Sequence, residues 1–363
     1  MHRRLRTIAL YLPQYHPIPE NDEWWGRGFT EWTNTAKAKP LFRGHYQPHV
    51  PADLGFYDLR LPEARAAQVD LAREYGLDAF CYYHYWFAGR RILERPFNEV
   101  LVSGVPDFPF CLCWANETWT GIWHGAENKV LIEQTYPGEQ DHRNHFSTLL
   151  SAFRDPRYVT VDGKQLIAIY RPFNIPGYKN FIELWRELAH KAGLKGLHIV
   201  SLQIPPAGLQ YDCIDAFVIS RFPPRKTRVW TSRRHPVEYF KGKILEIYKK
   251  PTVYSYEKVS LDLLNYKVPS VINYPCLVPN WDNTPRSGAN GLVLNGSTPQ
   301  LFRKQVHKAL QLAAELSTDE KFIFIKSWNE WAEGNHLEPD LKYGHGYLRV
   351  IKEEIEAQGN MHR

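Results

Sequence analysis

Two glutamates stand three positions apart near the end of the chain, in the stretch SWNEWAEGN that follows the apolar run FIFI. Glu330 and Glu333 can both give and take protons. Cleavage of a glycosidic bond uses such a pair, one carboxyl group to protonate the departing oxygen and one to assist at the sugar carbon. The same spacing also suits the first turn of an ordinary helix, where carboxylates favour the positive end of the dipole. Trp328, Trp331 and Gly334 are poor residues for a helix start, and both interpretations stay open on this pattern alone.

The elements that would position these glutamates follow a regular alternation. Short apolar runs alternate with amphipathic helical segments for most of the length. Continuous apolar strands separated by helices are typical of parallel sheet covered on both faces. We predict eight strands, at residues 7–12, 79–83, 110–114, 166–170, 198–202, 216–219, 270–274 and 322–325.

Eight such units predict an α/β fold, a (β/α)8 TIM barrel with extended βα loops. A doubly wound sheet is the alternative, but no GxGxxG turn follows the first strand to support it. No internal repeat, low-complexity tract or Pro/Gly/Ser-rich linker divides the sequence, so we expect a single catalytic domain over residues 1–363. The least regular segment, residues 222–268, is predicted to be an insertion in the barrel.

Side chains just beyond the C-terminal ends of barrel strands converge on one mouth. The segments HYWF, WANETW and PCLVPNWDN follow predicted strands and pair Trp or Tyr with His, Asn, Asp or Glu, whereas REYG and HKAGLKG at the opposite end do not. Flat rings with polar rims suit sugars, so we predict an oligosaccharide or polysaccharide substrate. Besides Glu330 and Glu333, the candidate substrate-binding residues are Tyr11, Gln14, Tyr15, Trp24, Trp25, Glu31, Trp32, His84, Tyr85, Trp86, Trp114, Asn116, Glu117, Trp281, Asp282, Trp328, Asn329 and Trp331.

Several of these residues have competing interpretations. His84 fits a sugar-hydroxyl partner or a buried hydrogen-bonded histidine better than a metal ligand, because no HxH or HExxH pattern accompanies it. Asp282 could instead form an Asx turn ahead of Pro285. His336, Glu338 and Asp340 alternate along a loop and could contact a cation, but that spacing is weak evidence. No GxSxG turn or Walker loop points to another chemistry.

The net charge and the cysteine content limit which partners and which cellular compartment we expect. Lys and Arg exceed Asp and Glu by six (45 against 39), and no basic ribbon interleaved with aromatics indicates nucleic acid. The basic runs are compatible with a peripheral membrane contact or a phosphorylated substrate, although a solvated face is the simpler interpretation. Five cysteines without a zinc-type spacing predict buried free thiols. The N-terminal apolar stretch is too short for a signal peptide, and no run of about 18 apolar residues occurs, so we expect a cytoplasmic protein without a transmembrane segment.

The assembled motifs resemble the WbsX-type polysaccharide-biosynthesis proteins, which are related to glycoside hydrolase family 99. The resemblance runs from about residue 8 to 348. It is carried by YLPQYHPIPENDEWWGRGFTEWTN, KPLFRGHYQPHVPADLGFYDLRLPE, GLDAFCYYHYWFAGRRILERPFNEVL, DFPFCLCWANETWT, WDNTPR and SWNEWAEGNHLEPD. The step to family 99 itself is more distant and rests on the barrel and the terminal NEWAEG.

This resemblance implies a retaining, endo-acting α-mannosidase mechanism with two glutamates in an E-x-x-E arrangement, matched by Glu330 and Glu333. It implies that Glu330 assists the substrate's own 2-hydroxyl as internal nucleophile, through a 1,2-anhydro sugar, and that Glu333 is the acid and then the base at the leaving oxygen. It implies no metal and no cofactor. An i, i+3 spacing places two carboxylates side by side, with Cβ atoms about 5–6 Å apart, which suits neighbouring atoms of one sugar.

Two questions follow from this assignment. As an acid near neutral pH, Glu333 needs a raised pKa, and we expect the apolar flank of Trp331 to provide it. WbsX-type proteins are also labelled glycosyltransferases of O-antigen or capsule assembly, but the sequence shows no DxD motif or dinucleotide turn. A glycosyltransferase and a non-catalytic glycan-binding barrel remain the alternatives to a glycosidase or transglycosidase.

Overall fold

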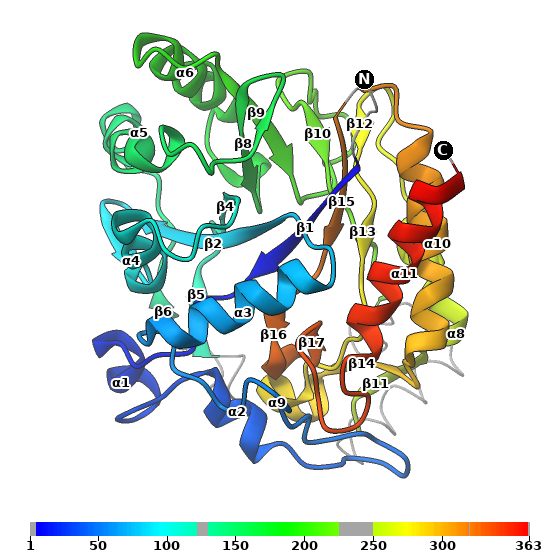
Figure 1. The fold of residues 1–363 in the computed structure, drawn as a ribbon. Helices are drawn as coiled ribbons and strands as arrows, with labels where there is room; N and C mark the ends of the chain where they lie inside the picture. Colours follow the sequence, from blue (N-terminus) through cyan, green and yellow to red (C-terminus); the bar gives the residue numbers. More distant parts are fainter. Residues whose placement is uncertain (1–4, 122–129, 225–249, 319, 362–363) are drawn as a thin grey trace, which may run out of the picture.

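A curled sheet of parallel strands lies at the centre of the protein, in a computed structural model that describes residues 5–121, 130–224, 250–318 and 320–361 (Figure 1). The strands pair in the order β12, β10, β9, β8, β4, β2, β1, β15, β13. Their bounds are β1 (Leu5–Tyr11), β2 (Ala79–Phe87), β4 (Phe110–Trp114), β8 (Lys164–Ile169), β9 (Leu197–Ser201), β10 (Ala216–Phe217), β12 (Ile272–Asn273), β13 (Cys276–Leu277) and β15 (Lys321–Ile325).

Each of the eight predicted strands has a counterpart in this sheet, but the seventh is divided. β12 pairs with β10, and β13 pairs with β15, with only Tyr274 and Pro275 between them. The Tyr274 amide still donates to Phe217 O at 2.9 Å, while the Pro275 carbonyl accepts from the Phe324 amide at 2.8 Å. Proline has no N–H to continue a ladder, so one short segment passes from one neighbour to the other and closes the sheet. The predicted (β/α)8 barrel is confirmed.

Helices cover the outside of the sheet (Figure 1). Long helices are present between strands, as the alternation in the sequence predicts. α10 begins with standard capping: Pro299 lies in its first turn, and Thr298 Oγ1 accepts the Leu301 amide at 3.2 Å. Within the described part of the chain, none of these helices is long and apolar enough to cross a membrane. The helices are α1 (Pro19–Trp25), α2 (Glu31–Lys37), α3 (Pro62–Glu74), α4 (Arg95–Ser103), α5 (Glu139–Phe153), α6 (Tyr178–Lys191), α8 (Tyr256–Val259), α9 (Thr284–Ser287), α10 (Pro299–Ala314) and α11 (Gly346–Met361).

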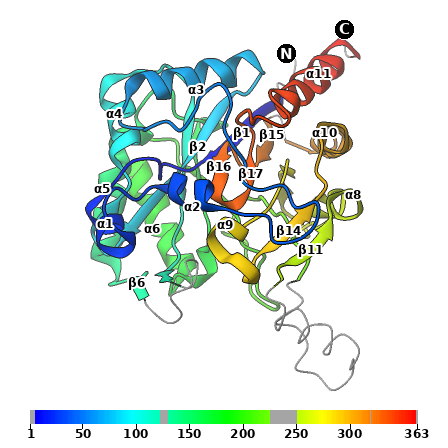
Figure 2. The same cartoon turned by 90° about the horizontal axis from the view of Figure 1, so that it is seen from below.

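The long loops at the C-terminal ends of the strands carry short elements of their own. Seen from that end, β16 and β17 lie near the centre, with α1, α2 and α9 around them (Figure 2). The remaining short elements are β3 (Arg90–Ile92), β5 (Trp119–Thr120), β6 (Val130–Ile132), β7 (Thr160–Val161), β11 (Thr252–Ser255), β14 (Leu292–Asn295), β16 (Asn329–Glu330) and β17 (Asn335–His336), with 3-10 turns η2 (Pro172–Asn174), η3 (Asp262–Leu264), η4 (Gly288–Asn290) and η5 (Trp331–Glu333).

The predicted insertion at residues 222–268 is described only in part, because residues 225–249 lie outside the described residues. Its later half supplies β11, which pairs in parallel with β14 in a separate small sheet. Tyr256 and Leu263 from this half pack with Val278, Leu292 and Leu294 in a second apolar cluster. The insertion therefore packs largely on the loop after β13, while Leu264 and Val268 near its end join the main core of the barrel.

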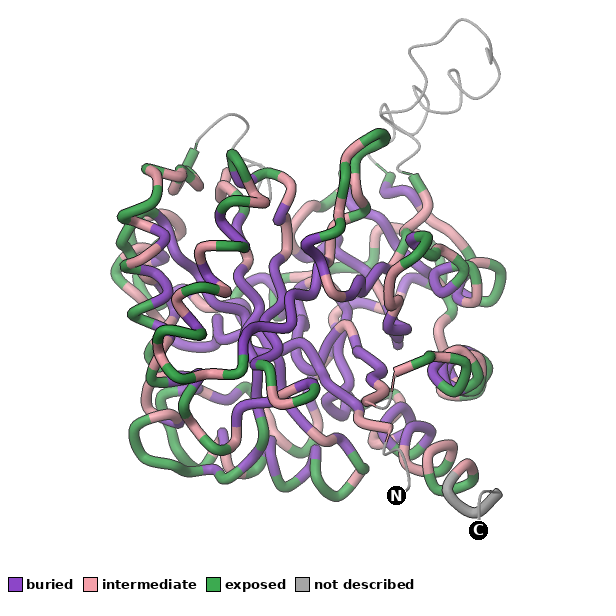
Figure 3. Tube along the Cα trace, turned by 90° about the horizontal axis from the view of Figure 1, so that it is seen from above, coloured by how far each residue is buried: buried purple, intermediate pink, exposed green. Residues whose placement is uncertain are grey.

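Burial follows the barrel, with the strands and their immediate flanks inside and the outer helix faces exposed (Figure 3). All nine residues of β2 are buried, as expected for a strand covered on both sides. The five cysteines are free and buried, which confirms the prediction of buried free thiols.

Candidate active site

The stretch around Glu330 and Glu333 forms a tight hairpin directly after β15, not the first turn of an α-helix. β16 pairs with β17 antiparallel, Glu330 opposite Asn335, and η5 makes the turn between them. Ser327 Oγ accepts the Glu330 amide at 3.0 Å and donates to Asn335 O at 2.8 Å, which fixes the base of the hairpin. Gly334 turns with φ of 50°, and a Cβ there would lie 2.9 Å from Asp282 Cβ, so a larger residue is excluded.

Both glutamates line one pocket of about 240 Å³ at the mouth of the barrel, here called the acidic pocket. The Glu330 side chain is buried, and that of Glu333 is 12% exposed. Burial and the neighbouring Glu333 carboxylate raise the pKa of Glu330 to about 8, against the opposing effect of Lys326. Glu330 therefore favours its protonated form near neutral pH and shares the pocket with a second carboxyl group that accepts from Arg286, an arrangement suited to acid–base work.

Arg286, at the end of α9, joins two carboxylates of the acidic pocket. Its Nη1 donates to Glu333 Oε1 at 2.8 Å and its Nε donates to Glu31 Oε2 at 3.0 Å. Although burial disfavours the charged guanidinium, Glu31 and Glu333 raise the pKa of Arg286 above its ordinary value. Burial also raises the pKa of Glu31, and Arg286 opposes that shift. Arg286 thus holds Glu333 in place and connects it to the loop that follows β1.

Aromatic rings and a lysine form the walls. Tyr83, Tyr85, Tyr170, Trp25 and Trp119 all line the acidic pocket. A second pocket of about 290 Å³, here called the side pocket, shares Tyr170, Lys326 and Glu333 with it, so the two form adjoining lobes of one cleft.

The Lys326 ammonium lies where the lobes meet, 5.3 Å from the ring centre of Trp281 and 5.9 Å from that of Tyr170. Burial opposes its charge, but Tyr170, Glu330 and Glu333 raise the pKa of Lys326. A cation is therefore available beside the glutamates throughout the neutral range.

The predicted residues divide into those that reach the cleft and those that lie behind it. Gln14, Trp25, Glu31, Tyr85, Glu117, Glu330 and Glu333 line the acidic pocket, and Trp281 lines the side pocket. Trp24 stands beside the cleft, its ring 6.0 Å from that of Trp119. The others pack behind these walls: Tyr11, Tyr15, Trp32, His84, Trp86, Trp114, Asn116, Asp282, Trp328, Asn329 and Trp331.

Strand alternation explains much of this division. Along β2, Tyr83 and Tyr85 face the cleft, while His84 contacts His145 of α5 at 2.8 Å between Nε2 atoms and Trp86 stacks on the same ring at 4.6 Å. His84 is therefore a buried hydrogen-bonded histidine, one of the interpretations left open by the sequence.

Several polar groups behind the cleft hold its loops. Asn329 donates to Leu12 O at 3.0 Å and accepts the Leu12 amide at 2.7 Å, and Tyr15 donates to Asn329 O. Trp32 Nε1 donates to Tyr57 O at 2.7 Å. These residues fix the loop after β1 against the hairpin, which makes them positioning groups.

The expected role of Trp331 beside Glu333 is not what the structure shows. Its ring stacks on His336 at 3.7 Å, and its Nε1 donates to Glu338 at 2.6 Å on the side of the hairpin away from the cleft. The raised pKa of about 8 belongs to Glu330, through burial and Glu333. The reason is that Trp331 and Glu333 both lie in the 3-10 turn η5, in which side chains three positions apart share a side and those two positions apart do not.

Asp282 also lies apart from the cleft. It accepts from Gln47 at 2.6 Å and pairs with His45 at 2.5 Å, and its carboxylate accepts the Thr284 amide at 2.9 Å. The Asx-type contact to Thr284 is one of the two roles expected for Asp282, and the hydrogen bond with His45 connects it to the loop after α2.

Sequence reasoning missed Arg286, Lys326, Tyr83, Tyr170 and Trp119 as cleft residues. Lys326 is the first residue beyond β15, and Tyr170 directly follows β8, so the rule that selected the loops would have found both had it begun at the strand end. Arg286 carried no such signal, since its position depends on how α9 folds back over the mouth.

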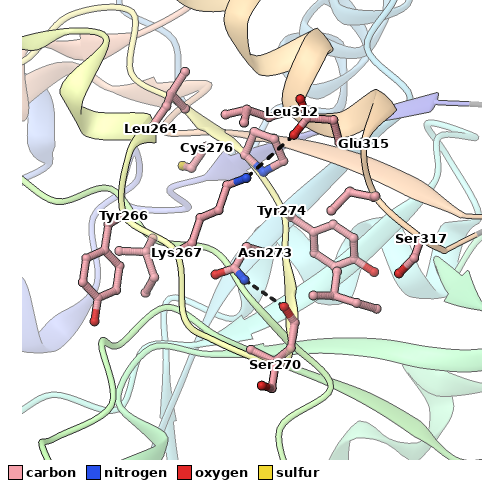
Figure 4. Close-up of a pocket in the computed structure, with 15 residues that line it drawn as sticks. Leu264, Tyr266, Lys267, Ser270, Asn273, Tyr274, Cys276, Leu312, Glu315 and Ser317 are labelled. Carbon is pink, nitrogen blue, oxygen red and sulfur yellow. Dashed lines mark hydrogen bonds and ion pairs between the residues drawn. The ribbon is translucent and has the colours of Figure 1, made fainter.

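Another cavity, of about 510 Å³, lies elsewhere (Figure 4). It is lined by residues at the start of β12 and the end of α10, and hence lies at the N-terminal ends of the strands. Lys267 and Glu315 approach to 3.8 Å across it. Barrel active sites are built at the other end, where the carboxyl pair lies.

Comparisons with known proteins agree on the family and the fold. The chain matches the family model "Glycosyltransferase WbsX" over residues 7–351. Two curated relatives, both named "Uncharacterized protein WxcX" and from two strains of Xanthomonas campestris pv. campestris, are 36% identical over 354 residues. That match covers 96% of this chain and 49% of each relative, so the chain spans about half the length of the curated relatives it matches.

Two solved structures share the fold across nearly their whole lengths. A "Glycoside hydrolase-like protein" superposes with a TM-score of 0.58 at 16% identity, covering 96% of this chain and 93% of that one. The GH99 endo-alpha-mannosidase from Bacteroides thetaiotaomicron has a TM-score of 0.53 at 15% identity, covering 98% of both chains. At these identities the likeness establishes the barrel fold. With a family model that matches almost the entire barrel, the chain belongs to the WbsX family.

Proposed function

We propose that this protein is a retaining glycosidase or transglycosidase that acts on α-linked, mannoside-like glycans, with residues 1–363 as one catalytic domain. The observation that carries the proposal is the pairing of Glu330 and Glu333 in one aromatic-walled pocket at the C-terminal mouth of the barrel. Tyr83, Tyr85 and Trp25 would contact sugar faces there. The fold shared with a GH99 endo-alpha-mannosidase supports the choice of chemistry.

In the proposed mechanism Glu330 takes the proton of the sugar 2-hydroxyl, and Glu333 protonates the leaving oxygen and later activates water. The 2-oxygen then attacks the anomeric carbon, the glycosidic bond breaks, and its oxygen leaves with the proton from Glu333. Glu333 next takes a proton from water, whose oxygen attacks the anomeric carbon. The bond from that carbon to the 2-oxygen breaks, and the 2-oxygen regains its proton from Glu330. The raised pKa of Glu330, about 8 through burial and Glu333, makes its carboxylate a stronger base than an ordinary glutamate. Their neighbouring positions on one hairpin support roles on the same side of the sugar.

The location of the proton before substrate binds bears on these roles. Burial favours the protonated form of Glu330, while Arg286 donates to the Glu333 carboxylate. Two interacting carboxyl groups titrate as a unit. We propose that the shared proton passes to Glu333 when a substrate hydroxyl occupies Glu330, which readies both groups for their steps.

Substrates that differ in leaving group separate the two roles. Glu333→Gln should retain turnover of an activated aryl glycoside or glycosyl fluoride but lose turnover of an unactivated α-mannoside, because a good leaving group needs no acid. Glu330→Gln should lose both. The matched control is Glu117→Gln, which alters an exposed pocket carboxylate paired with Arg171 at 2.9 Å and should act within about tenfold of the parent.

Near-normal rates for either Glu330→Gln or Glu333→Gln on an unactivated substrate would contradict the mechanism. The opposite pattern, with Glu330→Gln rescued by activated substrates, would exchange the two roles. Intact glycan after long incubation, with measurable binding, would instead indicate the non-catalytic glycan-binding alternative.

A glycosyltransferase of O-antigen or capsular polysaccharide assembly is the second candidate, favoured by the name of the family model. Titration with nucleotide sugars distinguishes it: tight binding specific for one nucleotide would support transfer from an activated donor. Cytoplasmic location, a peripheral membrane contact and the absence of a nucleic-acid partner remain predictions from the sequence.

A further inference from the structure

Two loops far apart in the sequence run side by side beneath the hairpin. The Ala52 amide donates to Pro339 O and the Leu341 amide donates to Val50 O, both at 2.9 Å. Pro51 bridges to Asp340 in the antiparallel sense. This pairing brings His49, from the loop after α2, against His336 of β17 and Asp340 beyond it.

These three side chains form a buried cluster, here called the histidine site. His49 is 6% exposed, His336 1% and Asp340 2%. One nitrogen of each imidazole and one carboxylate oxygen lie within 4.8 Å of one another, and His49 Nδ1 is 2.9 Å from His336 Nε2. Two nitrogens bound to one ion at about 2.0–2.1 Å lie about 2.9–3.4 Å apart, for angles between square and tetrahedral.

Hydrogen bonds from neighbouring residues orient His336 and Asp340, as the outer-shell partners of metal ligands do. His336 Nδ1 is 2.9 Å from Glu338 O and donates its proton there, which turns the lone pair of Nε2 toward His49. One Asp340 oxygen accepts the amides of Lys342 at 3.0 Å and Tyr343 at 2.6 Å. The other lies 3.3 Å from the Tyr46 hydroxyl.

Space for the rest of a coordination sphere adjoins the cluster. A cavity of about 110 Å³ is lined by His49 and Asp340 and also by Asn280 and Asp282. A cavity of that size admits an ion and completing water molecules. Glu338, considered with His336 and Asp340 as a cation ligand from the sequence, turns away to Trp331 and Gln68 and takes no part.

We propose that His49, His336 and Asp340 bind one divalent transition-metal ion, with Zn²⁺ as the best fit, and that this ion joins the two loops. Two imidazoles and one carboxylate favour such ions over Mg²⁺ and Ca²⁺, which prefer oxygen ligands throughout. The role is structural, because the site lies under the hairpin: His336 pairs with Asn329 across β16 and β17 and stacks on Trp331. The proposal does not depend on the reaction carried out in the cleft.

The protein contains an internal control for this proposal. His84 and His145 form a second buried pair, 2.8 Å apart between Nε2 atoms, and no group of three metal-ligating side chains among the described residues includes them. If paired imidazoles alone explained the histidine site, both pairs would behave alike toward metal. The carboxylate of Asp340 is the feature that differs.

The test uses the full chain stripped with a chelator and given one equivalent of Zn²⁺, followed by gel filtration and metal analysis. We expect about one Zn²⁺ retained per chain and a rise in Tm of a few degrees, with no rise for Mg²⁺ or Ca²⁺. His49→Gln and Asp340→Asn should each weaken Zn²⁺ binding more than about 100-fold, since loss of even an outer-shell partner costs about 10–100-fold. His84→Gln should bind as the parent does.

Asp340→Asn keeps an oxygen to accept the amides of Lys342 and Tyr343, so a folded variant is expected. Anomalous scattering at the zinc edge from crystals of the parent protein provides a second measurement that needs no variant. The proposal would be overturned if the parent failed to retain Zn²⁺, or if His49→Gln and Asp340→Asn retained as much Zn²⁺ as the parent. An anomalous peak at another place in the structure would also overturn it.

Discussion

Glu330 and Glu338 lie eight positions apart, are both buried, and have similarly perturbed acidities, yet their surroundings differ completely. Burial raises the pKa of Glu338 to about 7, and burial with Glu333 raises the pKa of Glu330 to about 8. Glu338 accepts from Trp331 Nε1 and Gln68 Nε2 at 2.6 Å and from Tyr57 OH at 2.9 Å. Glu330 faces a pocket and shares it with a second carboxyl group.

The contrast teaches that a shifted pKa identifies burial before it identifies function. Both shifts arise chiefly from desolvation, and both carboxyl groups belong to the same short sequence stretch rich in aromatics. The distinguishing feature is what the oxygens contact: three fixed donors in one case and space for a ligand in the other. Glu338 is therefore assigned to anchoring the back of the hairpin, and Glu330 to the cleft.

The sharpest way to break this assignment is to remove each carboxylate in turn. Glu330→Gln and Glu333→Gln should each lower kcat on an unactivated substrate by at least about 10³-fold, or about 4 kcal/mol of barrier, while unfolding as cooperatively as the parent. Steady-state rates with denaturant titrations measure both quantities. If Glu338→Gln loses as much activity per folded molecule as Glu330→Gln does, the two glutamates do not differ in the proposed way.

Glu338→Ala should show its main effect on stability. The change leaves the Trp331, Gln68 and Tyr57 donors without their acceptor, and each orphaned buried donor costs about 1–3 kcal/mol, so unfolding should become easier by at least about 3 kcal/mol. Glu338→Gln retains one acceptor oxygen and is the matched control, with a smaller loss. Unchanged stability of Glu338→Ala would remove the anchoring role.

Arg286 is expected to rank next, because it orients Glu333 without being placed to transfer a proton. Arg286→Met should reduce kcat/KM by about 10–100-fold. It should also raise the pH below which the rate falls on the acidic side of the profile, since the pKa of a carboxyl group rises when a cation beside it is lost. Arg286→Lys keeps the charge but loses the forked donors, and should recover only part of the rate. The measurement is a pH–rate profile for the parent and the two variants. Profiles with the same acidic midpoint would contradict an effect of Arg286 on the pKa of Glu333.

The pH dependence of folding gives the smallest expected effect. Glu330 has a raised pKa in the folded protein, about 8 against an ordinary 4.5, so its stabilising contribution is complete below about pH 4.5 and is lost as the pH rises through about 8. The free energy of unfolding of the parent should therefore fall from pH 7 to pH 8 by about 1 kcal/mol more than that of Glu330→Gln, which cannot ionise. Parallel curves for the two proteins would show that the proton is not held at Glu330.

Much of the architecture was predictable from the sequence because apolar runs and helix ends carry local signals. All eight strand positions were recovered on that basis. The division of the seventh strand was not predictable, because the segment around Pro275 pairs first with β10 and then with β15. Helix α4 was also missed, although Pro96 in its first turn and the left-handed Gly104 at its end are standard boundary signals.

The site was predictable in position but only partly in membership. Strand-end logic placed Glu330, Glu333, Glu31 and Tyr85 correctly at the mouth. It could not separate Tyr85 from Trp86, because the facing of neighbouring strand residues depends on a register that a single sequence does not display. It could not separate Glu333 from Trp331 either, because the sequence did not predict the 3-10 turn that contains both. Arg286 and Lys326 were overlooked since the search began from carboxylates and rings. The catalytic roles themselves remain predictions.

β2 carries a consequence for how this protein can change in length. Its nine residues are all buried, with Tyr83 and Tyr85 toward the cleft and His84 and Trp86 toward α5. Deleting or adding one residue before Tyr83 would exchange the two sets, presenting packing groups to the ligand and ligand groups to the helix. Insertions and deletions are therefore expected only in the loops, where they can change specificity. The strand itself can accept substitutions but not a change in register.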